Sequence, residues 1–186
     1  MRNETKRNGI IIGALLITIA LMTIGYAALA TQLTINGTAS TGDAKWEISF
    51  LSIAKNDTLS TIDAVEVDTP TASGTAATFN VKLPQPGSKI VYDLVVQNTG
   101  TIDATFKEVT GVTETNNAQP TQITYTVDRL DSADGSVVTG TGDLLNTTGK
   151  NYFRVTIEWP ENAGMPTTDV TSKTGTIYLD YSQKVS

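Results

Sequence analysis

Two stretches of alternating residues decide the fold: Ile90-Val-Tyr-Asp-Leu-Val-Val96 and Tyr152-Phe-Arg-Val-Thr-Ile-Glu-Trp159. Both are rich in β-branched and aromatic residues, which fit a pleated surface. Their apolar side chains recur with a period of two, as in a half-buried strand. Pro84-Gln85-Pro86-Gly87 precedes the first stretch and Asn98-Thr99-Gly100 follows it, and both are turn sequences. Each stretch therefore predicts a strand of an all-β protein.

The same pattern extends outward along the chain. It predicts further strands at 32–38, 45–53, 64–67, 77–83, 104–109, 122–129, 136–139 and 174–183. Asp131–Gly135 is a candidate hairpin loop between two of them. Residues 110–120 and 139–150 are polar and are expected to form loops, and no helical apolar stripe follows residue 30. Many short strands separated by turns indicate an antiparallel β-sandwich, jelly-roll or immunoglobulin-like.

The first 30 residues have the features of a signal peptide. Arg2, Lys6 and Arg7 precede an apolar stretch from residue 10 to 25, and Ala28-Leu-Ala30 has the small-x-small pattern of a cleavage site. We therefore expect cleavage before Thr31, a single sandwich domain over 31–186, and secretion to the cell surface or matrix. An uncleaved anchor is the alternative, because residues 10–30 have about the length that spans a bilayer.

The composition limits the chemistry of the chain. It has no Cys and no His, which removes disulfides, thiolate nucleophiles and the commonest general base and metal ligand. The acidic groups at Asp128, Asp131 and Asp134 are spaced by three and do not match a calcium loop. The net charge of −6 argues against nucleic acid as a partner. We expect no enzyme activity, no cofactor and no metal.

Two sets of side chains allow two interpretations each. Trp46 and Trp159 lie in strand patterns and are expected in the core, although exposed tryptophans would serve as platforms for carbohydrate. Lys45 and Asp180, on an early and a late strand, are candidates for an intramolecular isopeptide bond. Both are more simply solvated surface charges.

The segment Gln32-Leu33-Thr34-Ile35-Asn36 is a candidate donor strand. Cleavage after Ala30 would leave it near a new N-terminus. Leu33 and Ile35 share one face, and the three polar residues share the other. Such a strand can complete its own sheet, or it can add to the exposed edge of a neighbouring molecule and polymerise the protein.

Several motifs resemble the TasA/camelysin family of secreted biofilm-fibre and surface proteins of Gram-positive bacteria. They are the signal ending in Ala28-Leu-Ala30, the block Thr78-Phe-Asn-Val-Lys-Leu-Pro-Gln-Pro-Gly87 with the Asn98-Thr-Gly turn after it, and the terminal Thr176-Ile-Tyr-Leu-Asp-Tyr-Ser-Gln183. The resemblance implies a jelly-roll-like sandwich and fibre assembly by donation of the N-terminal strand. A metalloprotease activity described for camelysin-type members is not carried over, because the chain has no His and no HExxH motif.

Two functions are therefore expected from the sequence. The first is a secreted structural protein that forms homopolymers at the cell surface or in a biofilm matrix, with other surface or matrix proteins as further partners and a membrane involved only through the signal segment. The alternative is a monomeric adhesin or carbohydrate-binding surface module, which an exposed aromatic patch would favour.

Overall fold

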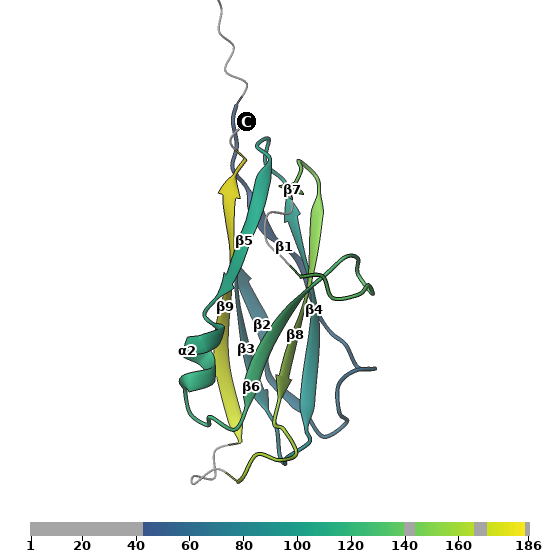
Figure 1. Ribbon diagram of the computed structural model, residues 1–186, viewed down its shortest axis with the longest axis vertical. Coiled ribbons are helices and arrows are strands. Elements are labelled where there is room, and N and C mark those ends of the chain that lie inside the picture. The colour runs from purple at the N-terminus through teal and green to yellow at the C-terminus, as the bar shows by residue number, and fades with distance from the viewer. Residues whose placement is uncertain (1–42, 140–143, 166–170, 185–186) are drawn as a thin grey trace, which may run out of the picture. The chain divides into compact units, whose positions relative to one another are not determined.

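The computed structural model describes residues 43–139, 144–165 and 171–184, which form a β-sandwich with one short helix (Figure 1). Its strands are β1 (Ile48–Lys55), β2 (Val65–Ser73), β3 (Ala76–Lys82), β4 (Lys89–Asn98), β5 (Ala104–Thr110), β6 (Thr124–Leu130), β7 (Leu144–Leu145), β8 (Lys150–Glu158) and β9 (Ser172–Gln183). The helix is α2 (Val112–Asn117). The candidate cleavage site and the candidate donor strand both lie outside the described residues.

The strands form two antiparallel sheets. One has the order β1-β4-β8-β6 and the other the order β2-β3-β9-β5-β7. Among the described strands, only the β2–β3 connection joins sequence neighbours within one sheet, and every other connection crosses to the opposite sheet. The antiparallel β-sandwich predicted from the sequence is confirmed.

The core lies between the sheets and follows the alternation of the sequence. On β3, Phe79 and Val81 are buried while the residues between them are not, and Phe153, Val155 and Ile157 repeat this pattern on β8. Burial of alternate side chains fixes the register, because a shift by one residue would turn the apolar set to solvent. The strands predicted at 90–96 and 152–159 are β4 and β8, and they are paired neighbours at the centre of their sheet.

The two tryptophans have different environments. Trp159, at the end of β8, is 1% exposed, and its backbone is hydrogen bonded to the turn before β4 through Gly87 and Ser88. Trp46 is 44% exposed, so its expected place in the core is wrong. The reason is that β1 begins only at Ile48, so Trp46 precedes the strand and lines an open groove.

The helix α2 replaces part of an expected loop (Figure 1). Its sequence has no apolar stripe, and its six residues are held by tertiary contacts instead. The Asn116 side chain donates to the Tyr125 carbonyl at 3.0 Å and accepts from the Tyr125 N–H at 2.6 Å, so it pairs with β6 as a strand would. Thr115 is buried against β9, where Gly175 leaves room for its methyl group.

Two other expectations are corrected in detail. The expected strand at 136–139 is a single bridge, in which Val137 pairs with Leu130. The hairpin before it is confirmed, since the Asp131 N–H donates to the Ser136 carbonyl at 3.1 Å. The short strand β7 lies in a stretch expected to be a loop, and Leu145 is buried in the core.

Lys173 on β9 is a buried lysine. Its ammonium donates to the carbonyls of Ile123 at 2.6 Å and Pro120 at 3.0 Å, which lie between α2 and β6. Loss of hydration on burial lowers the pKa of Lys173 to about 8. The folded protein therefore releases this proton at lower pH than the unfolded chain does.

We expect the free energy of unfolding to rise as pH increases from about 8 towards 10. In that window the unfolded chain binds more protons at this lysine than the folded protein does. The free energy of unfolding therefore rises with pH. Above pH 10 the buried tyrosines oppose the trend, because burial raises the pKa of Tyr125 and Tyr181 in the folded state. Urea unfolding at several pH values measures the slope.

The control is Lys173→Met, which keeps most of the length of the side chain and removes the titrating group. The rise between pH 8 and 10 should be absent from this variant. An identical slope in both proteins would show that Lys173 does not titrate in this range.

Candidate assembly site at an open strand edge

The strand β9 is longer than either of its neighbours and extends past both. Its first half, Ser172–Tyr178, pairs with β3, and its second half, Tyr178–Gln183, pairs with β5. On the β3 side, no described strand continues beyond the β2–β3 turn. The second half of β9 therefore has one open edge among the described residues.

Backbone alternation shows which groups face this open edge. The Leu179 N–H donates to the Thr75 carbonyl at 3.0 Å, so it points away from β5. Since backbone groups alternate in direction along a strand, the N–H and C=O of Tyr181 and Gln183 point the same way. These groups can pair with another strand, or with water.

The opposite wall is the start of β1. The Phe50 N–H donates to the Gly74 carbonyl at 3.3 Å, so by the same alternation the backbone groups of Ile48 face the opening. The β2–β3 turn thus contacts both sheets: its Gly74 carbonyl accepts from β1 and its Thr75 carbonyl accepts from β9. Beyond this turn the two sheets are not joined by any described strand.

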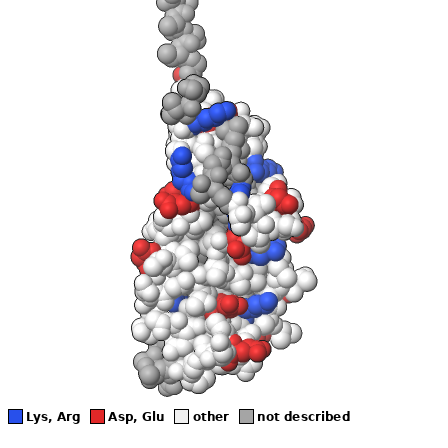
Figure 2. Space-filling view, in the orientation of Figure 1, with Lys and Arg blue, Asp and Glu red and all other residues white. Residues whose placement is uncertain are grey.

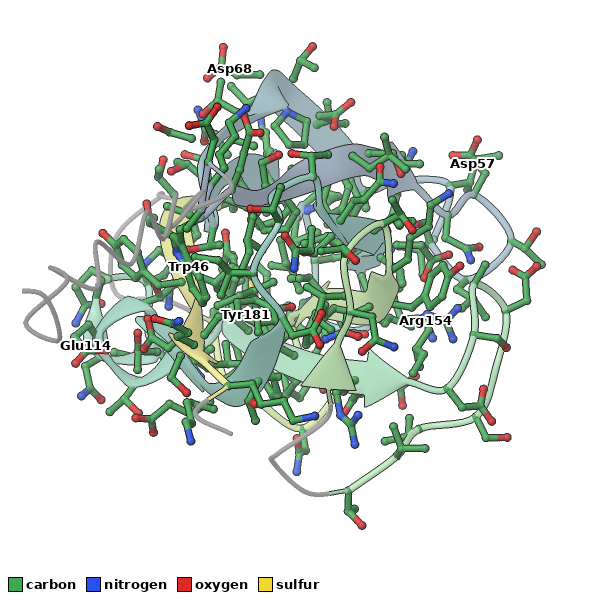
Figure 3. The ribbon with its side chains drawn as sticks, turned by 90° about the horizontal axis from the view of Figure 1, so that it is seen from above. Trp46, Asp57, Asp68, Glu114, Arg154 and Tyr181 are labelled. Carbon is green, nitrogen blue, oxygen red and sulfur yellow. The ribbon has the colours of Figure 1, made fainter. Side chains whose placement is uncertain are left out.

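A groove of about 460 Å³ occupies this opening. We call it the seam groove; it is lined by Trp46–Ser49 before and at the start of β1, by Gly74 and Thr75, and by Leu179–Tyr181 on β9. Figure 3 looks down on this end of the sandwich, with Trp46 and Tyr181 near one another and Asp57 and Asp68 at the periphery.

The aromatic walls of the seam groove are held by the core. The Tyr181 ring makes an edge contact with Phe106, with centroids 5.5 Å apart, and its hydroxyl accepts from the Asn151 side chain at 3.3 Å. Burial raises the pKa of Tyr181 to about 12, so the phenol stays neutral near pH 7. Together with Trp46 it supplies aromatic surface to a groove whose lining also includes polar side chains.

The chain before β1 is fastened beside the groove. The Lys45 carbonyl accepts from the Thr101 N–H at 2.8 Å, and the Glu47 carbonyl accepts from the Thr99 N–H at 2.9 Å. A Cβ on Gly100 would overlap the Lys45 carbonyl oxygen, so only glycine permits this approach. The chain therefore enters the described part of the molecule next to the seam groove, and β9 ends there too (Figure 1).

The charges around the groove are exposed and partly paired. Lys45 and Glu47 form an ion pair at 2.6 Å, and the hydrogen bond from Lys45 is the largest of the effects that lower the pKa of Glu47. Asp180 accepts from the Thr110 hydroxyl at 3.2 Å. Within the described residues no three Asp or Glu side chains converge on a metal position. On the visible face, acidic and basic side chains are interspersed (Figure 2).

The structure does not bring the candidate isopeptide residues together. The Lys45 side chain is 61% exposed in its ion pair, and Asp180 is exposed on β9. The buried lysine is instead Lys173, whose amine contacts backbone carbonyls and not a side-chain amide or carboxyl group. This geometry offers no side-chain electrophile for an isopeptide bond at Lys173.

Sequence reasoning missed the seam groove, because its walls come from three separated segments. One signal was present. The predicted strand at 174–183 is longer than the neighbouring strand patterns at 77–83 and 104–109, and a long strand between shorter ones leaves part of its edges unpaired.

Comparison with models of known protein families, with curated proteins and with solved structures gave no match. The class of fold, an all-β antiparallel sandwich, therefore comes from the strand pairing alone. In the described part of the chain, no helix has both the length and the apolar character needed to cross a bilayer.

Proposed function

We propose that this chain is a secreted structural protein of the cell surface or biofilm matrix, and that Gln32–Asn36 of one molecule docks in the seam groove of the next. The observation that carries the proposal is the open edge of β9 between Leu179 and Gln183, beside an aromatic groove. Secretion is inferred from the signal-like first 30 residues.

The size and polarity of the candidate strand suit this edge. Gln32–Asn36 has five residues, which span about 17 Å as a strand, and this is enough to cover Asp180–Gln183, the part of β9 beyond the Leu179–Thr75 hydrogen bond. A docked strand would turn Leu33 and Ile35 towards the core and leave its polar residues outside. The segment carries no charge, so it brings no charge repulsion towards Asp180 at the groove.

The direction in which the chain enters the sandwich favours docking of Gln32–Asn36 in the groove of a neighbouring molecule over docking in its own groove. The chain before β1 arrives at the end of the sandwich where β9 finishes, and β1 runs away from that end. A strand that folded back from this entry into its own groove would run parallel to β9. All pairings in the described sheets are antiparallel, and antiparallel pairing is slightly more stable per residue. A donated strand is free to run antiparallel.

Engineered cysteines test where the strand docks, because the chain has no native Cys. Thr34 lies on the polar face of the segment, and the side chain of Asp180 points to the outer face of β9. In the proposed arrangement these two positions are cross-strand neighbours within disulfide reach. Oxidation of Thr34→Cys/Asp180→Cys should give a ladder of covalent multimers on a non-reducing gel.

The matched control is Thr34→Cys/Asp57→Cys, because Asp57 is exposed and lies away from the groove. It should not form the ladder. A double variant that closes into a cross-linked monomer would show that the strand completes its own sheet, and equal cross-linking at Asp57 and Asp180 would mean that the groove is not the docking site.

A monomeric carbohydrate-binding module is the second candidate, and the exposure of Trp46 favours it. An open indole ring beside the Asp180 carboxylate and the hydroxyls of Ser49 and Thr75 also suits a sugar. This function predicts saccharide binding that Trp46→Ala abolishes, and no multimers at any protein concentration.

A further inference from the structure

A second hollow lies on the opposite edge of β9, beside the first half of the strand, which β5 does not pair with. On this side β5 stops at the pair Thr110–Tyr178, and α2 stands beside the first half of β9 in place of a strand. The hollow between them is about 560 Å³. We call it the helix-side hollow, and it shares no lining residue with the seam groove.

Tyr178 forms an aromatic wall of this hollow. It is 46% exposed, although its neighbours Ile177 and Leu179 are fully buried. Gly111 has a φ of 85°, and a Cβ there would lie 2.5 Å from the Thr176 carbonyl oxygen and 3.0 Å from the Tyr178 ring. Glycine therefore lets the ring lie against the backbone of the β5–α2 turn, which supports one side of the ring and leaves the rest open.

The remaining lining is rich in hydroxyl groups. Thr110, Thr174 and Thr176 line the hollow, and the Thr176 hydroxyl is hydrogen bonded to Thr78 on β3 at 2.8 Å. The residues that line it include one carboxylate, Glu114, and no lysine or arginine. This chemistry does not suit an anionic ligand, because no cation is present to balance the charge. An apolar ligand would cover the Glu114 carboxylate without giving it a partner.

We propose that the helix-side hollow binds a neutral polysaccharide segment. The Tyr178 ring packs against the apolar face of one sugar ring, as aromatic side chains with an exposed face can do. The Glu114 carboxylate accepts hydrogen bonds from sugar hydroxyls, the Thr174 hydroxyl donates or accepts a further one, and the oxygens of the other lining threonines, whose hydroxyls are hydrogen bonded within the protein, can accept. The hollow is open to solvent on one side, so a long chain can pass across it. This function is additional to assembly and does not depend on it.

Titration calorimetry of the mature protein with cellohexaose, maltohexaose and chitohexaose tests the proposal. At least one of these neutral hexasaccharides should bind, and Tyr178→Ala should weaken that binding about tenfold or more, the size expected for loss of a stacked aromatic contact. Glu114→Gln, which keeps the shape and removes the charge, should weaken it by a smaller factor.

Trp46→Ala is the control, because Trp46 lies in the other hollow. It should leave hexasaccharide binding unchanged. Failure of all three hexasaccharides to bind would overturn the proposal, and so would binding that is lost in Trp46→Ala and kept in Tyr178→Ala. Since Tyr178→Ala leaves the seam groove intact, this variant should still assemble, so failure of the binding proposal is distinguishable from failure of assembly.

Discussion

Aspartate at both Leu33 and Ile35 is expected to leave the mature protein as a folded monomer that no longer assembles. Each of these side chains would contribute about 1.5–3 kcal/mol when buried in a neighbour's seam groove. Aspartates would lose this contribution and would also place two further negative charges beside Asp180, and beside Glu47 in the same groove. We expect the loss of assembly to be complete at concentrations where the unchanged protein assembles.

Light scattering and thermal unfolding on the same samples measure this effect. The control is Gln32→Asp/Asn36→Asp, which adds the same charge to the polar face of the segment but not at Thr34, the position opposite Asp180, and it should retain assembly. If Leu33→Asp/Ile35→Asp lowers the melting temperature, and both it and the unchanged protein are monomers throughout, the strand belongs to its own sheet and donor-strand assembly is wrong.

Alanine at the two tryptophans should have very different effects on stability. Trp159 is 1% exposed at the end of β8, and Trp159→Ala should lower the free energy of unfolding by about 3–5 kcal/mol through the cavity that it leaves. Trp46 is 44% exposed, and Trp46→Ala should change the same quantity by less than about 1 kcal/mol. Chemical denaturation of both variants gives the two values.

The comparison is internally controlled, because the same truncation is made at both sites. Equal losses of stability at the two positions would mean that Trp46 is part of the core. In that case the seam groove would lack its exposed ring, and both functions proposed for this end of the sandwich would lose support.

The sequence was sufficient to predict most of the strands, because the alternation that marks them is local. Phe79 and Val81 on β3, and Phe153 and Val155 on β8, are buried as their spacing predicts. The antiparallel sandwich follows from many such strands. What alternation does not give is which strand lies beside which, or how far each pairing extends.

The features that sequence reasoning missed depend on contacts between distant segments. The helix α2 has no stripe of its own and is held through Asn116, which binds the backbone of Tyr125. The exposure of Trp46 depends on where β1 begins, which is two residues later, at Ile48. The seam groove exists because β3 pairs with β9 only as far as Tyr178, where the β2–β3 turn lies, so the rest of β9 has no partner strand on that side among the described residues. None of these facts has a signal within a short window of sequence.

Electron microscopy of the mature protein, beginning at Thr31 and incubated at rising concentration, tests the central claim most directly. Donation of Gln32–Asn36 to the seam groove of the next molecule is a head-to-tail contact, and repetition of such a contact builds an open chain. We expect fibres whose number increases with protein concentration and which are absent from Leu33→Asp/Ile35→Asp. Monodisperse single particles at every concentration would contradict it.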